Sequence, residues 1–115
     1  MSEIVKRKLS RSEVERYLVD WGYEPEKVAR FLSQYAENPD VWKAFEAMTL
    51  DLIARKKTAG ANAILERIRW DTTVEGGRDW KVNNTFAPYY ARVFVLKYPE
   101  HIGFFEFRRV QSDDL

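Results

Sequence analysis

Apolar residues recur three, four and seven positions apart along much of the chain, which is the spacing of one face of a helix. Stripes of this kind cover about residues 11–21, 25–36 and 39–57, and a fourth runs from 61 to about 70 or 73. In the first stripe Val14 and Leu18 are followed one turn later by Trp21. The pattern predicts four amphipathic helices that direct their apolar faces at a shared core.

Helix-starting and helix-ending residues separate these stripes. Ser10 and Glu13 have the spacing of a capping box, in which each side chain accepts a hydrogen bond from an amide at the helix start. Gly22 suits the left-handed turn that ends a helix. Pro25 and Pro39 suit first helical positions, because an amide hydrogen there would have no partner within the helix. Three helix starts and one helix end are therefore marked by local chemistry.

The second half of the chain mixes helix and strand signals. Two adjacent glycines indicate a turn over residues 75–78. Residues 80–83 alternate apolar and polar side chains, and residues 104–109 are rich in strand-favouring types. A fifth helix is expected between them, over about 86–97. We expect the two strands, Trp80–Asn83 and Phe104–Arg109, to form an antiparallel pair.

The predicted fold is mainly α, in the α+β class, with about five helices and one short antiparallel two-stranded sheet. A chain of 115 residues fits one domain, here residues 1–115. Residues 10–57 are expected to form a helical scaffold and residues 61–110 the functional half. The functional half has a winged-helix-like outline, although only one strand follows its last helix where a wing has two.

The amino-acid composition limits where in the cell the protein is expected and which kinds of site it can form. The chain has no cysteine, which excludes disulfides, thiolate metal sites and thiol catalysis. No apolar run approaches the roughly 18 residues that span a bilayer. The charged stretch at the amino terminus also lacks the apolar segment of a signal peptide. We therefore predict a cytoplasmic protein that has no membrane partner.

Positive charge is concentrated in the second half, although the formal net charge is only +1. Residues 55–112 carry eleven Lys or Arg against six acids. This excess is compatible with phosphate contacts but is weaker than the dense basic face of a dedicated nucleic-acid-binding domain. The basic run 55–57 has two interpretations, namely solvated cations at the negative end of a helix dipole or a phosphate-contacting patch.

Polar residues gather where the helix over 86–97 is expected to begin. Amides at a helix start attract anions, and Asn, Tyr and Arg side chains reach phosphate oxygens and base edges. The first functional hypothesis is therefore a small non-catalytic DNA-binding protein. Its expected contacts are Lys56, Lys57, Arg67, Arg69, Lys81, Asn83, Asn84, Thr85, Tyr89 and Arg92.

Four short motifs carry a resemblance to known proteins. They read I-R-W-D at 68–71, W-K-V-N-N at 80–84, P-Y-Y-A-R at 88–92 and G-F-F at 103–105. This pattern resembles a set of small uncharacterised proteins carried by bacteriophages and prophages, over roughly the carboxy-terminal two thirds of the chain. The resemblance implies a phage setting and assigns no catalytic residue.

The second functional hypothesis is a phage-encoded protein that binds a host protein, such as a defence nuclease, and inhibits or modulates it. A near-neutral net charge and a surface that mixes charged and aromatic residues favour this interpretation. No motif indicates a cofactor, a metal site or a small-molecule substrate, so the expected partner is either DNA or a host protein.

Enzymatic activity is not expected. Pro39-Asp40 and the later Asp79-Trp80-Lys81 loosely match the carboxylate and lysine set of metal-dependent nucleases, but both strings are short, common and far apart. His101 is the only histidine, and no motif provides it with a nucleophile. A metal-dependent nuclease is the enzyme alternative that these residues leave open.

Overall fold

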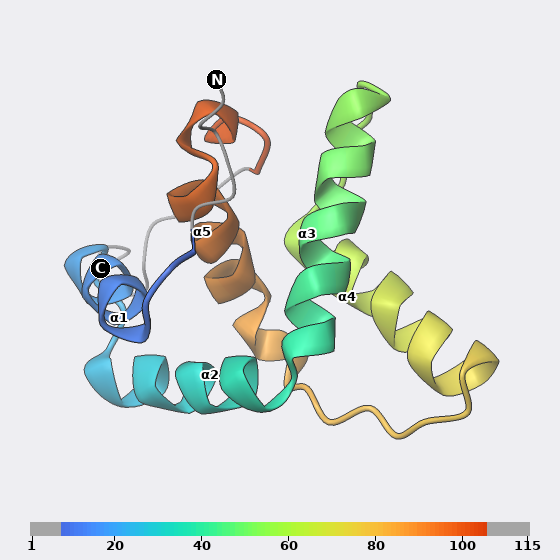
Figure 1. The fold of residues 1–115 in the computed structure, drawn as a ribbon, viewed down its shortest axis with the longest axis horizontal. Coiled ribbons are helices and arrows are strands. Elements are labelled where there is room, and N and C mark those ends of the chain that lie inside the picture. The colour runs from blue at the N-terminus through green and yellow to red at the C-terminus, as the bar shows by residue number, and fades with distance from the viewer. Residues whose placement is uncertain (1–7, 106–115) are drawn as a thin grey trace, which may run out of the picture.

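The computed structural model of the chain describes residues 8–105, and these form a helical fold (Figure 1). Five α-helices are joined by short connections and by three brief turns of π or 3₁₀ geometry. The helices are α1 (Arg11–Asp20), α2 (Pro25–Glu37), α3 (Pro39–Ala54), α4 (Ala61–Trp70) and α5 (Ala87–Lys97). The turns are the π-helical η1 (Asp71–Glu75) and the 3₁₀ turns η2 (Asn84–Phe86) and η3 (Pro99–His101).

Local signals in the sequence set the first helix boundaries, as predicted. The Glu13 amide donates to Ser10 Oγ at 3.1 Å, and the Ser10 amide donates to the Glu13 carboxylate at 3.4 Å, which completes the capping box. Gly22 follows α1 with φ of 105°, a conformation that glycine adopts without steric cost. Pro25 and Pro39 are the first residues of α2 and α3.

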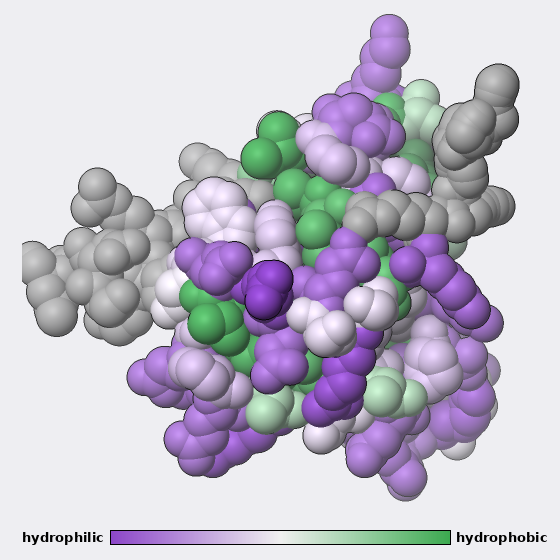
Figure 2. All heavy atoms as spheres, turned by 60° about the vertical axis from the view of Figure 1, so that its left-hand side comes forward, coloured by the Kyte–Doolittle hydropathy of each residue, from purple (hydrophilic) through white to green (hydrophobic). Residues whose placement is uncertain are grey.

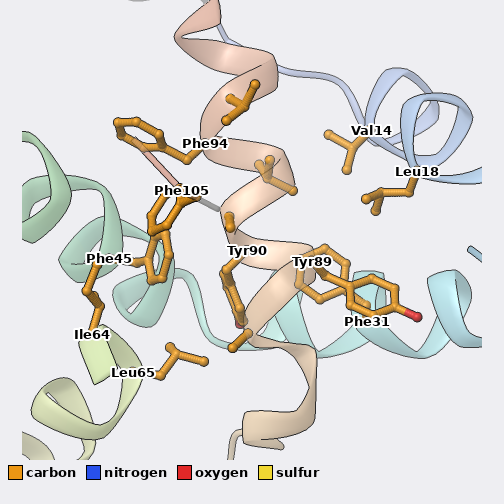
Figure 3. Close-up of a cluster of buried hydrophobic side chains, with 14 of the residues drawn as sticks. Val14, Leu18, Phe31, Phe45, Ile64, Leu65, Tyr89, Tyr90, Phe94 and Phe105 are labelled. Atoms are coloured by element: carbon orange, nitrogen blue, oxygen red, sulfur yellow. The ribbon is translucent and has the colours of Figure 1, made fainter. Parts of the chain in front are cut away.

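Helix α5 is the centre of the fold. It runs between α1 on one side and α3 and α4 on the other, and α2 crosses near its first turn (Figure 1). Eight of its eleven residues are buried, so every face of α5 is covered by another element. Phe31 of α2 contacts Tyr89 and Tyr90 of α5 with ring centroids 5.3 Å and 5.0 Å apart, and Phe45 of α3 contacts Tyr90 at 5.7 Å (Figure 3). Leu65 of α4 completes this side of the core.

The two-stranded sheet predicted from the sequence is wrong. Residues 8–105 contain no strand, and the connection over 76–83 is irregular. Residues 104–105 form a bend where the second strand was expected to start, and the rest of that expected strand, 106–109, lies outside the described residues. The winged-helix outline depended on the strand pair, so it is wrong as well.

Side-chain contacts hold the 76–83 connection in place of a strand ladder. The Trp80 indole donates from Nε1 to Asn84 Oδ1 at 2.9 Å, and the Asn83 amide donates to Gln34 Oε1 at 2.7 Å. Val82 is buried. The alternation of apolar and polar residues was read correctly as half-burial, but the covering surface is formed by helices. In the same described part of the chain, no helix has the length and apolar character to cross a membrane.

Candidate binding surface

The helix expected to read DNA keeps its two key side chains inside the protein. Tyr89 is only 6% exposed and packs against Tyr23, with ring centroids 4.6 Å apart. Burial, followed by the charges of Tyr23 and Glu24, raises the pKa of the Tyr89 phenol. Arg92 is 4% exposed and lies against the Trp21 ring. Neither Tyr89 nor Arg92 is therefore placed to contact a DNA groove in this conformation.

The polar residues before α5 are used within the fold. Asn83 Oδ1 accepts from the Thr85 amide at 3.0 Å and from Thr85 Oγ1 at 2.8 Å, which caps η2. Asn84 Nδ2 donates to Glu66 Oε2 at 2.6 Å while its Oδ1 accepts from Trp80. These bonds fasten the α5 entrance to α4. Asn83 and Thr85 remain exposed, but their side chains already have hydrogen-bond partners.

The candidate cations on α4 lie beside acids. Arg67 Nε is 3.3 Å from Asp71 Oδ1, and Arg69 Nη1 is 3.6 Å from Glu66 Oε1. Residues 61–86 carry four Lys or Arg and four Asp or Glu, so this part of the chain has no net charge. Lys81 is exposed on the connection that follows. The local field is therefore much weaker than the count for residues 55–112 indicated.

Lys56 and Lys57 lie apart from the other candidates. They follow the carboxy-terminal end of α3, whereas Arg67 and Arg69 occupy the later part of α4, which runs away from that end (Figure 1). The structure thus brings together the α4 cations with Asn83, Asn84 and Thr85. It does not bring together all ten candidates on one surface.

Sequence reasoning missed an exposed apolar pair on α4 and η1. Trp70 is 54% exposed and Val74 is 58% exposed. The helical spacing of 100° per residue puts Trp70 on the side of α4 opposite to the buried Ile64, Leu65 and Ile68. The helix was predicted from its inward apolar stripe, and a single outward tryptophan does not alter that pattern. We call Trp70, Val74 and the flanking Glu66 and Arg67 the Trp70 surface.

The turn that carries Val74 has a rare backbone. Asp71–Glu75 forms a π-helical turn directly after α4, and such turns are frequent at functional sites. A Cβ atom at Gly76 would lie 2.8 Å from the Thr72 carbonyl oxygen, so this position requires glycine. Gly77 has φ of 67°, and the Arg78 amide donates to the same Thr72 oxygen at 2.9 Å. The backbone conformation at the end of the Trp70 surface therefore depends on two glycines.

The opposite side of the molecule is different. On the face formed by α1 and α2, hydrophilic residues cover most of the surface and hydrophobic ones form separate smaller areas (Figure 2). Trp21 at the end of α1 is 44% exposed, but its ring rests on Arg92. Trp70 has a larger exposed fraction than Trp21. Within residues 8–105, no aromatic ring or cation contacts its indole.

Neither comparison with known proteins nor a group of metal-binding side chains indicates a function for this surface. No family model, curated protein or solved structure matches the chain. Within residues 8–105, no three His, Asp or Glu side chains are grouped so that they could hold a metal ion. Asp40 lies in the first turn of α3, and Asp79 is exposed in the irregular connection. The function must therefore be argued from the Trp70 surface itself.

Proposed function

We propose that the chain is a non-catalytic protein-binding domain that engages a partner protein through the Trp70 surface. The observation that supports this most is the Trp70 indole, which points away from the core and is 54% exposed. Folding gains nothing from that exposed area, because apolar surface is stabilising only where water is removed from it. Binding to a partner would remove it.

The expected gain is large enough to matter. A tryptophan buries roughly 150 to 250 Å² in a core or interface, so covering the exposed half is worth about 3 kcal/mol. Trp and Arg are also the residues most enriched among those that dominate interface energies. Val74 enlarges the apolar centre, and Arg67 with Glu66 forms its charged rim.

The charge of the Trp70 surface indicates the chemistry of the partner. Acids and bases alternate around the indole and balance over residues 61–86. A polyanion such as DNA would meet Glu66 and Asp71 as well as Arg67 and Arg69. A protein surface with an apolar depression and a rim of both charge signs fits better, because each rim charge can then face its opposite. A host protein, as in the second sequence hypothesis, is a partner of this class.

DNA binding stays a second candidate because of one observation. Lys56 and Lys57 are exposed side by side at the end of α3, and neither belongs to an ion pair in the described part of the chain. Two cations make few phosphate contacts, so the affinity should be low and strongly salt-dependent. The side chains expected to contact DNA bases are already hydrogen-bonded within the protein, namely Asn83, Asn84 and Thr85.

The test compares variants that change only the exposed apolar atoms. Wild type, Trp70→Ala and Ile102→Ala are immobilised, and host lysate is passed over each with and without nuclease treatment. Ile102 is the matched control, because it is 54% exposed like Trp70. It lies directly after η3, far along the chain from α4. A protein retained by wild type and Ile102→Ala but lost on Trp70→Ala is then purified, and its direct binding is measured by calorimetry.

The outcomes separate the candidates. We expect Trp70→Ala to weaken the purified complex by at least about 2 kcal/mol, the size expected for a central interface residue. Retention that is equal on all three proteins would reject the Trp70 surface. Binding that disappears with nuclease treatment, together with a salt-dependent anisotropy change on labelled duplex, would support the DNA candidate instead.

A further inference from the structure

The end of α3 and the segment that follows α5 line a shallow hollow of about 390 Å³ that is largely open to solvent. Ile53 and Phe104 provide apolar lining, and Lys56, Lys57 and Thr58 provide polar groups. The hollow lies at the end of α3 remote from the last turn of α4, so it is separate from the Trp70 surface.

The backbone at Lys56 is strained in a way that places two lysines at this hollow. Lys56 has φ of 59°, the left-handed conformation in which glycine is preferred. The Lys57 amide donates to the Leu52 oxygen at 2.9 Å and the Lys56 amide to the Ile53 oxygen at 3.0 Å, which is the bond pattern of a helix end closed by a left-handed residue. A lysine in that position costs stability that a glycine would not. Strain of this kind is often kept where a side chain serves a function.

The charge of the hollow favours an anion. Lys56 and Lys57 contribute two positive charges, and Glu100 contributes one negative charge at the rim. The His101 ring, which also lines the hollow, has Nε2 3.9 Å from Glu100 Oε2. The two lysines and Glu100 together give the lining a net charge of +1, and the Thr58 hydroxyl adds a donor beside the lysines.

We propose that this hollow binds a small organic phosphate. The phosphate would lie between the Lys56 and Lys57 ammonium groups and accept a hydrogen bond from Thr58, while its apolar body would cover Ile53 and Phe104. Two adjacent lysines match the double charge of a phosphate monoester better than the single charge of a carboxylate. The apolar lining distinguishes an organic phosphate from the inorganic ion, which has no surface to place against Phe104.

The test is a titration of ¹⁵N-labelled full-length protein with phenyl phosphate, followed by NMR. Inorganic phosphate and benzyl alcohol serve as probes of the two halves of the ligand. We expect saturable shifts at the amides of Lys56, Thr58, His101 and Gly103, weaker binding of inorganic phosphate, and no saturation with benzyl alcohol. The alternative result, inorganic phosphate binding as tightly as phenyl phosphate, would overturn the proposal of an organic ligand.

Three variants test the assignment of the lysines. Lys56→Gly removes the ammonium group while relieving the backbone, so lost binding cannot come from unfolding; we expect about tenfold weaker binding, as for loss of one charged hydrogen bond. Lys43→Ala removes an exposed charge from the other end of α3 and should change nothing. Glu100→Gln removes the opposing charge and should tighten binding about twofold. Equal effects of Lys43→Ala and Lys56→Gly, or no saturation up to roughly 10 mM ligand, would overturn the proposal.

Discussion

The guanidinium carbon of Arg92 lies 3.9 Å from the centre of the Trp21 ring, although the two residues are 71 positions apart in the chain. A cation held over an aromatic face is attracted by the negative charge density of the ring. Arg92 is 4% exposed while Trp21 is 44% exposed, so the indole covers the arginine and faces water with its other side. The apolar stripe in the sequence predicted that Trp21 is a core residue. In the structure its ring lies at the surface, over Arg92.

Trp21→Ala should therefore destabilise the protein by about 1 to 2 kcal/mol, which combines the loss of a partly buried ring with the loss of a cation–π contact. A fully buried aromatic gives a larger loss, so Phe45→Ala and Phe94→Ala should each cost about 3 to 5 kcal/mol. Both phenylalanines are 0% exposed. Chemical denaturation of the three variants measures this. A loss at Trp21 equal to that at Phe45 would contradict the half-exposed position.

Gly76→Ala should destabilise the protein, because its Cβ would lie 2.8 Å from the Thr72 carbonyl oxygen and this oxygen belongs to the backbone. Moving the backbone costs about 1 to 3 kcal/mol. Gly103→Ala is the matched control, since beyond the adjacent residues no atom lies within 4 Å of the added carbon. Thermal unfolding should show a clear loss for the first variant and little change for the second. If both behave alike, the π turn is not held as described.

Lys56→Gly should stabilise the protein by about 1 kcal/mol, because φ of 59° is costly for lysine and open to glycine. Lys57→Gly provides the contrast. Lys57 is not among the residues of positive φ, so the same replacement there should bring no such gain. Denaturation midpoints of the two variants decide the point, and a loss of stability in Lys56→Gly would show that its side chain contributes more than the strain costs.

Signals that act over a few residues predicted the helices well. Ser10 with Glu13, Gly22 and the prolines at 25 and 39 each decide a helix end through bonds made within one turn, so no knowledge of the rest of the chain is needed. The central position of α5 was also predictable, because apolar residues on every face of a helix require cover on every face.

Contacts between distant segments were not predictable from the same patterns. The alternation around Trp80 and Val82 indicates half-burial but does not say whether a strand or a helix provides the cover. Arg92 was expected to be exposed. The ring that covers it comes from the end of α1, far away in the sequence, so the local pattern did not show this contact. Trp70 lies on the outward side of α4 in any helical projection, yet only the fold shows that no other described element packs over it. The candidate site depended on these distant contacts.

Glu46 of α3 joins two residues at the end of α5. Tyr98 Oη donates to Glu46 Oε2 at 2.6 Å, and Lys97 Nζ lies 2.6 Å from the same oxygen. Burial, then the hydrogen bond to Glu46 and the charges of Glu46 and Glu100, raises the pKa of the Tyr98 phenol. Burial, followed by the charges of Glu46 and Tyr90, also raises the pKa of Tyr35 to about 12.

These pKa shifts predict a loss of stability in alkali. An unfolded tyrosine releases its proton near pH 10, whereas Tyr35 keeps its proton to about pH 12 in the folded protein. The folded state thus holds more protons in this window, so the contribution to stability is complete below pH 10 and is lost as pH rises toward 12. Urea denaturation at several pH values should show a steeper decline for wild type than for Tyr35→Phe, and the least steep decline for Tyr35→Phe combined with Tyr98→Phe. Equal slopes in wild type and the double variant would show that neither phenol holds its proton more tightly when the protein is folded.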